Sequence, residues 1–180
     1  MQAPIGNFAE AWRAVDRPDL VGPPVLEALS VWSAGEEVLV VDTDPELADT
    51  ANFCAAYDVS AEASANCVVV AAKRSGTVTL VACVVLASTR ADVNGLVRKH
   101  LDARKASFAS TDTAVELTGM EYGGITPIGL PSDWPLLVDA AVANTPYVII
   151  GSGRRRGKLL IPGKLLSALP HAQTLAGLGI

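Results

Sequence analysis

The chain has 180 residues, of which half are apolar and only 18% are charged, and its mean hydropathy is +0.34. This composition excludes a disordered protein, and the length suits one domain with a substantial core. The longest uninterrupted apolar run, Leu80–Ala87, is too short to cross a bilayer, and residues 1–11 lack the pattern of a secretory signal. We therefore expect a cytoplasmic protein that does not enter a membrane.

The charges are unevenly distributed along the chain. The formal net charge of −5 argues against a nucleic-acid partner. Residues 1–72, however, carry 12 acidic and two basic side chains, whereas residues 73–180 carry seven acidic and 12 basic ones. This asymmetry suggests one face made for an anion. The alternative is that the two halves interleave in the fold and the asymmetry averages out.

The cysteines and histidines do not have the spacing of a metal site. The chain contains Cys54, Cys67, Cys83, His100 and His171, and it has no CxxC motif. Two of the cysteines stand in apolar runs, where a thiol usually acts as a small core side chain. We expect reduced thiols and no bound metal, and no spacing favours a Cys/His nucleophilic pair.

The first predicted elements follow an N-terminal extension, residues 1–22. Pro23-Pro24 predicts the start of a helix that runs to about Ser30. The β-branched segment Glu37–Val41 predicts a strand. Asp44 followed by proline is a favourable helix start, and this helix is expected to run to about Tyr57.

The middle of the chain contains the clearest strands, Asn66–Ala72 and Thr77–Leu86. The four residues Lys73–Gly76 between them predict a hairpin loop. A helix is expected over Asp92–Leu101, and a short strand over Lys105–Phe108.

The last part of the chain mixes helices and strands. A short helix is expected to end at Thr118, with Gly119 as the residue after it, and a loop rich in glycine and proline follows over residues 119–135. The remaining predicted elements are a short helix from Asp139, strands at Tyr147–Ile150 and near Leu159, and a helix over Pro162–Leu169. This order of hairpins and helices predicts an α+β fold around a mixed sheet.

The segment Gly151–Lys158 contains three consecutive arginines between glycines. A phosphate-binding P-loop needs four residues between its glycines and a serine or threonine after the lysine, and neither condition is met. The dinucleotide-binding fingerprint fails as well. The segment is therefore a tight turn with exposed arginines, or a turn in which Arg154, Arg155 and Arg156 hold phosphates electrostatically.

The segment Thr118–Gly129, with the sequence TGMEYGGITPIG, is the most informative one. Its glycines let the backbone approach a ligand closely and turn its N–H groups inward, as an oxyanion or carboxylate site requires. The alternative is an ordinary multi-turn connection.

The loop GMEYGGITPIG resembles the signature loop of the YbaK/prolyl-tRNA synthetase-associated editing domains. These are small α+β proteins that hydrolyse amino acids from wrongly charged tRNA. The resemblance extends from about Pro24 to Leu169. It implies a mixed, partly barrel-like β-sheet flanked by helices, in a single domain over residues 23–180.

The resemblance also implies a site. Gly123–Pro127 matches the GxxxP loop that cradles the aminoacyl group at the tRNA 3′ end, and the ester is cleaved without a metal or an organic cofactor. The candidate catalytic residues are Asn66, Gly123, Gly124 and Asp139, and the candidate substrate-binding residues are Phe53, Gly119, Thr126, Pro127, Gly129, Arg154, Arg155 and Arg156.

One position departs from the family pattern. These domains usually carry a lysine at the start of the first hairpin strand, where this chain has Asn66. Lys73 lies seven residues farther on, or roughly 20 Å along a strand, which is too far to replace it. We expect Asn66 to face the pocket, although it brings no positive charge; the alternative is a residue at the edge of the hairpin.

These observations lead to three functional hypotheses. The first is a free-standing aminoacyl-tRNA deacylase that edits mischarged tRNA, whose acceptor end lies between Asn66, the loop 119–129 and Asp139. The phosphates of the tRNA would contact the turn with Arg154, Arg155 and Arg156, and the basic residues within 98–105. The second is a weak or inactive member that binds aminoacyl-tRNA or a small ligand, because the lysine is replaced. The third is a hydrolase of another small ester or amide.

Overall fold

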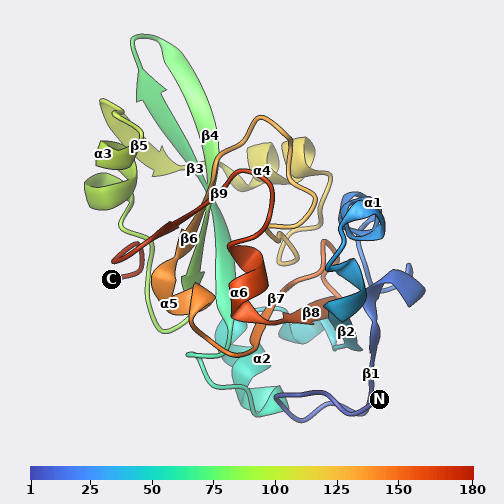
Figure 1. The fold of residues 1–180 in the computed structure, drawn as a ribbon. Helices are drawn as coiled ribbons and strands as arrows, with labels where there is room; N and C mark the ends of the chain where they lie inside the picture. Colours follow the sequence, from blue (N-terminus) through green and yellow to red (C-terminus); the bar gives the residue numbers. More distant parts are fainter.

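The computed structural model describes all 180 residues, and none of its helices has the length and apolar composition needed to cross a membrane. Its strands form two sheets (Figure 1). The first has the order β1-β2-β8-β7 and is antiparallel throughout. The second has the order β5-β3-β4-β6-β9, in which β4, β6 and β9 run parallel and the other neighbours antiparallel. The strands are β1 Ala11–Arg13, β2 Leu39–Asp42, β3 Ala65–Arg74, β4 Thr77–Leu86, β5 Lys105–Phe108, β6 Leu136–Asp139, β7 Val148–Gly151, β8 Gly157–Ile161 and β9 Ala172–Leu175.

The helices are short and lie around the two sheets (Figure 1). They are α1 Pro23–Val31, α2 Thr50–Tyr57, α3 Arg98–His100, α4 Thr111–Thr118, α5 Ala140–Ala143 and α6 Gly163–Leu166, with 3-10 turns at Ala14–Asp16, Gly35–Glu37 and Pro45–Leu47 and a π-helical turn at Val93–Val97. The predicted α+β class is therefore confirmed. Neither sheet closes on itself; the two meet where Ser64, just before β3, forms a parallel bridge with Ile149 of β7.

The main core lies between the inner faces of the two sheets. It includes Val40 of β2, Leu159 of β8 and Val84 of β4, all fully buried. Alternate residues of the first sheet point to its other face, where Leu160 packs in a second cluster with Phe53 of α2. The first sheet is thus covered on both faces, which explains why β8 is apolar at consecutive positions.

Helix α2 is shorter than predicted. The sequence favours one helix from Asp44 to Tyr57, but the structure has a 3-10 turn over Pro45–Leu47 and begins α2 anew. The reason is a second capping residue, because the Asp49 carboxylate accepts hydrogen bonds from the amides of Ala51 and Asn52. This break places the start of α2 beside β3.

The β3–β4 hairpin is longer and its turn tighter than predicted. The strands continue to Arg74 and from Thr77, so the turn consists of Ser75 and Gly76 alone. Both turn residues have positive φ angles, 47° and 83°, as two-residue hairpin turns require. The hairpin therefore extends beyond the rest of the molecule (Figure 1).

The N-terminal residues contribute to the first sheet. Strand β1 pairs with β2, and Leu20 and Val21 are fully buried in the main core. The proposed domain boundary at residue 22 stays a prediction. The segment before it is joined to the first sheet through the pairing of β1 with β2.

Candidate active site

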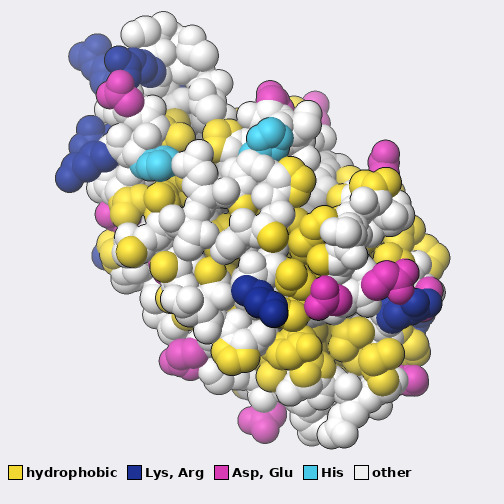
Figure 2. Space-filling model, viewed as in Figure 1, with side chains coloured by type: hydrophobic (Ala, Val, Ile, Leu, Met, Phe, Trp, Pro, Cys, Tyr) yellow, Lys and Arg dark blue, Asp and Glu magenta, His cyan; other side chains and the backbone are white.

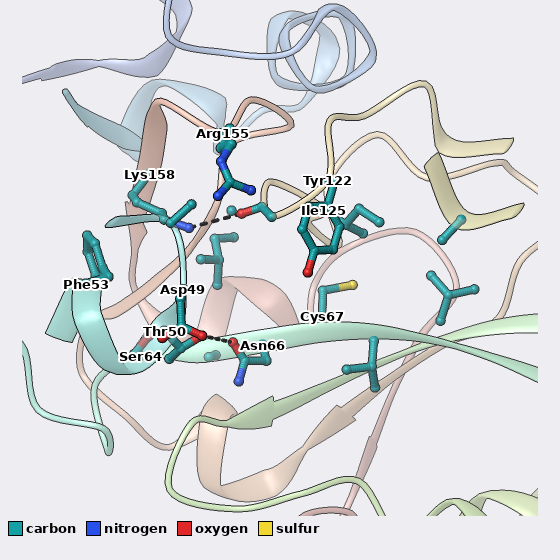
Figure 3. A pocket seen from close by; sticks show the side chains of 18 of the residues that line it. Asp49, Thr50, Phe53, Ser64, Asn66, Cys67, Tyr122, Ile125, Arg155 and Lys158 are labelled. Atoms are coloured by element: carbon teal, nitrogen blue, oxygen red, sulfur yellow. Dashed lines mark hydrogen bonds between the residues drawn. The ribbon is translucent and has the colours of Figure 1, made fainter. Parts of the chain in front are cut away.

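A cavity of about 490 Å³ lies where α2, β3, β7, β8 and the loop after α4 meet. Apolar side chains form much of its wall, and polar groups from several elements reach it (Figure 3). Its polar and charged lining residues are Asp49, Thr50, Ser64, Asn66, Thr111, Arg155 and Lys158.

The cavity brings together four of the candidate residues from the sequence. They are Phe53, Asn66, Gly123 and Arg155. The other candidates, Gly119, Gly124, Thr126, Pro127, Gly129, Asp139, Arg154 and Arg156, lie outside its lining.

Asn66 lies near the start of β3, beside the N-terminus of α2 (Figure 3). Its side-chain oxygen accepts a hydrogen bond of 3.0 Å from the Thr50 hydroxyl. Its amide nitrogen makes no hydrogen bond within the protein, so both of its N–H donors remain free for a ligand.

The loop after α4 is fixed against the arginine turn, residues 151–157. The Gly153 amide donates to the Gly124 carbonyl at 2.7 Å, and the Glu121 amide donates to the Gly153 carbonyl at 3.0 Å. A Cβ on Gly124 would lie 2.5 Å from the Arg154 carbonyl oxygen, so only glycine allows this approach. The pairing holds Gly123, at φ +80°, on the cavity wall.

The remaining candidates in this loop are part of its packing. Thr126 and Pro127 are buried, and the Thr126 hydroxyl has no hydrogen-bond partner. Gly129 lies against the Pro24 backbone of α1, and Gly119 follows the last residue of α4.

The three arginines of the turn have different surroundings. The Arg156 guanidinium forms a two-pronged ion pair with Asp42, whose shorter contact is 2.6 Å. Arg154 donates to the Val21 carbonyl at 3.1 Å. The Arg155 side chain donates only through its Nε, to the Pro45 carbonyl at 2.8 Å, and its guanidinium is directed into the cavity (Figure 3).

Asp139 lies at the end of β6 and is only 4% exposed. Its carboxylate accepts a hydrogen bond of 3.1 Å from the Gly179 amide near the end of the chain. It therefore holds the C-terminal residues, outside the cavity lining.

Lys158 of β8 is a cavity residue that the sequence did not single out. It is 8% exposed, its Nζ lies 3.3 Å from the Gly123 carbonyl oxygen, and it lies 5.4 Å from the centre of the Phe53 ring. Burial, together with the charge of Arg155, lowers the pKa of Lys158 below its usual value of 10.5. The available signal was a single charged residue in an otherwise apolar strand, GKLLI.

The cavity lacks the residues of a nucleophilic triad. Cys67 lines it, but burial raises the pKa of this thiol, so the unreactive thiol form predominates at neutral pH. His100 and His171 are not among its lining residues. No group of three or more His, Cys, Asp or Glu side chains is placed to hold a metal ion. The cavity instead offers hydrogen-bond donors and cations, which suit the positioning of an ester and a water molecule.

The chain is similar to known proteins both in sequence and in structure. The sequence matches the family model of the aminoacyl-tRNA editing domain over residues 44–168, and no curated protein sequence matches it. A protein described as a candidate trans-editing enzyme for prolyl-tRNA synthetase has a similar structure, with a TM-score of 0.73 and 20% identity over 98% of both chains.

Two further solved structures share the fold. One, from a study of epitope grafting onto scaffold proteins, has a TM-score of 0.73 and 21% identity, and covers 86% of this chain and 95% of its own. The other, a hypothetical protein, has a TM-score of 0.71 and 22% identity, and covers 86% of this chain and 96% of its own. Since the family model spans well over half of the sequence, this protein belongs to the aminoacyl-tRNA editing domain family, of the YbaK type.

Proposed function

We propose that the protein is a free-standing aminoacyl-tRNA deacylase that hydrolyses the ester of mischarged tRNA in the cytoplasm. The observation that carries this proposal is the cavity itself, because the loop resembling the editing-domain signature contributes Gly123 to its wall. Its volume of about 490 Å³ falls within the range of small-molecule sites, about 300–1,000 Å³. It can hold a small aminoacyl ester with part of its ribose.

The backbone of the loop supports the proposed chemistry. Gly123 and Ile125 line the cavity, and their N–H groups make no hydrogen bond within the protein. Such N–H groups stabilise the negative charge that develops on an ester carbonyl oxygen during hydrolysis. The Gly124 N–H is different, because it donates to the Glu121 carbonyl; Gly124 contributes by holding the loop against the arginine turn.

The proposed reaction is attack of a water molecule on the ester carbonyl carbon. The bond from that carbon to the tRNA hydroxyl oxygen breaks, and the proton lost by the water passes to the leaving hydroxyl. Asn66 is proposed to hold the substrate through its free amide N–H groups, and Phe53 to pack against its apolar part. The catalytic role of Asp139 rests on the family resemblance alone, since its carboxylate bonds Gly179.

The test is a panel of tRNAs mischarged with alanine, cysteine or serine, incubated with the protein while loss of the ester is followed. We expect at least one ester to be lost faster than it is spontaneously. The absence of turnover above the spontaneous rate across the panel would overturn the proposal.

A non-enzymatic binding protein is the second candidate, because Asn66 stands where related domains carry a lysine. The variants Asn66→Lys and Asn66→Ala separate the two functions. Activity that appears only in Asn66→Lys identifies the natural protein as a binder. Activity that is present in the natural protein and lost in Asn66→Ala identifies it as an enzyme.

A further inference from the structure

Two cations point into the cavity, and no carboxylate pairs with either. Lys158 reaches it from β8 and Arg155 from the arginine turn (Figure 3). The Lys158 Nζ contacts the Gly123 carbonyl, and a Cβ on Gly123 would lie 3.2 Å from an Nη atom of Arg155. The two like charges therefore lie next to the same glycine.

Their lack of partners distinguishes them from neighbouring cations. The structure contains seven ion pairs, and none includes Lys158 or Arg155. By contrast, Arg156 pairs with Asp42, and Arg154 lies 3.9 Å from Glu121. A buried cation is normally paired, since its transfer from water is costly. The unpaired state of Lys158 therefore needs an explanation.

Two carboxylates close to the cavity accept hydrogen bonds from backbone amides. Asp49 lines the cavity, but its carboxylate caps α2 by accepting from two backbone amides. Glu121 accepts a hydrogen bond of 2.7 Å from the backbone amide of Arg155 and is not part of the lining. The positive charge of the cavity is thus left for a ligand to neutralise.

We infer that Lys158 and Arg155 form an oxyanion-binding site. The natural ligand places a phosphate or carboxylate group in the cavity, next to these two cations. This inference rests on the proposed function, because the end of an aminoacyl-tRNA offers two such groups. One is the phosphate of the terminal nucleotide, and the other is the carboxylate of an acidic aminoacyl side chain.

The site is tested by binding measurements that need no hydrolysis. Calorimetry compares adenosine 5′-monophosphate with adenosine for the phosphate, and the 3′-aspartylamide of adenosine with its 3′-alanylamide for the carboxylate. We expect one anionic ligand of the two pairs to bind more tightly than its neutral counterpart. The pair that shows the difference identifies the source of the oxyanion.

Variants then assign the effect to the two cations. The quantity compared is the ratio of the affinity for the anionic ligand to the affinity for its neutral counterpart. In Lys158→Gln and Arg155→Gln this ratio should fall by about 30-fold, the loss expected for one partner of a desolvated charge pair. The matched control is Lys164→Gln, which removes an exposed positive charge on α6 and should leave the affinity unchanged. The inference is overturned if neither anionic ligand binds better than its counterpart, or if the gain persists in Lys158→Gln.

A second measurement separates ligand binding from a structural role. Lys158→Met keeps the length of the side chain but removes a buried charge without a carboxylate partner, so we expect equal or higher resistance to thermal unfolding together with lost anion binding. Marked destabilisation by this variant, with anion binding retained, would make Lys158 a structural residue. Because these assays need no turnover, their result is independent of whether the protein hydrolyses aminoacyl-tRNA.

Discussion

At the residue scale, the cavity combines a neutral amide and a buried cation from different strands. Asn66 on β3 accepts a hydrogen bond from the Thr50 hydroxyl through its side-chain oxygen. Lys158 on β8 brings a positive charge to the same cavity, beside the Gly123 carbonyl. The one cavity therefore holds an uncharged hydrogen-bond donor on β3 and a cation on β8.

Burial of Lys158 predicts a specific dependence of stability on pH. Its pKa is lowered in the folded state by burial and by Arg155, and the nearby Cys54 acts in the opposite direction. Between this lowered pKa and about 10.5, the unfolded chain binds more protons than the folded one, so the contribution of Lys158 to stability rises with pH.

This dependence is measured as the difference in unfolding free energy between the natural protein and Lys158→Met, from urea titrations between pH 7 and pH 10. Because both proteins share all other titrating groups, the difference isolates Lys158. We expect the unfolding free energy of the natural protein to increase relative to that of the variant as the pH rises. A difference in unfolding free energy that stays constant over this pH range would contradict a lowered pKa of Lys158.

At the scale of elements, the site depends on two turns that pack against each other. The loop after α4 and the arginine turn are joined through Gly124 and Gly153, and this contact places Gly123 opposite Lys158. Neither turn forms a wall of the cavity without the other. Their packing requires a residue without a side chain at position 124.

The variant Gly124→Ala should therefore disturb the cavity. The added Cβ would lie 2.5 Å from the Arg154 carbonyl oxygen and must push the two turns apart. We expect a loss of about 1–3 kcal/mol of stability, as for other overpacked sites, together with loss of ligand binding. Chemical denaturation and adenosine 5′-monophosphate titration measure the two effects.

The control for this prediction is Gly76→Ala at the hairpin turn. Its Cβ would meet no atom within 4 Å, but φ is +83°, so the change costs about 1–2 kcal/mol through backbone strain alone. It should destabilise the protein and leave the cavity intact. Equal ligand binding by the natural protein and Gly124→Ala would contradict the proposed dependence.

The sequence predicted those elements whose local pattern is strong. The hairpin of β3 and β4 follows from β-branched residues and turn signals. Strands β1, β6 and β9 were not predicted, because each has only three or four residues and is set by its neighbour in the sheet. The sequence predicts one helix over residues 92–101, and the spacing of its apolar residues does not show that Val93–Val97 forms a π-helical turn.

The candidate site was predictable only in part. Asn66, Phe53, Gly123 and Arg155 were chosen from motifs and a resemblance, and the structure places all four at the cavity. Lys158 was missed because it directly follows the turn with three arginines, and the sequence does not show that it is buried while Arg156 is exposed. Its direction depends on the pairing of β8 with β2 and β7, where it lies opposite Val41 and Gly151. Such register is decided by tertiary contacts.

At the scale of the whole molecule, two groups of positive charges stand out in the second half of the chain. One group is the arginine turn, where Arg156 pairs with Asp42 of the N-terminal half. The other group, the hairpin-end cluster, consists of the exposed residues Lys73, Arg74, Lys99, Arg104 and Lys105. Figure 2 shows lysine and arginine side chains gathered at this end of the molecule. Asp102 is the carboxylate that pairs with this cluster.

The hairpin-end cluster predicts where the rest of a tRNA makes contact. Lys73 and Lys105 lie opposite each other across β3 and β5, and β3 leads from this end to the cavity, roughly 20 Å away at the usual rise of a strand. We expect Lys73→Glu and Lys105→Glu each to weaken tRNA binding and to reduce the salt dependence of log K by about one unit.

Filter binding of a full tRNA at several salt concentrations measures this effect. Lys164→Glu reverses one charge on α6 and serves as the control, with an unchanged salt dependence expected. A salt dependence that is unaffected by Lys73→Glu and Lys105→Glu, but falls when Arg156 is replaced, would place the phosphates at the arginine turn instead.

The most direct test of the proposed function is hydrolysis of a mischarged tRNA under single-turnover conditions, with the protein in excess. This measurement removes the influence of product release and of weak tRNA binding on the rate. We predict a rate constant above that of spontaneous deacylation, which rises with protein concentration to a plateau and falls in Asn66→Ala. A rate constant equal to the spontaneous one at every protein concentration, for alanyl, cysteinyl and seryl esters alike, would contradict the assignment as a deacylase.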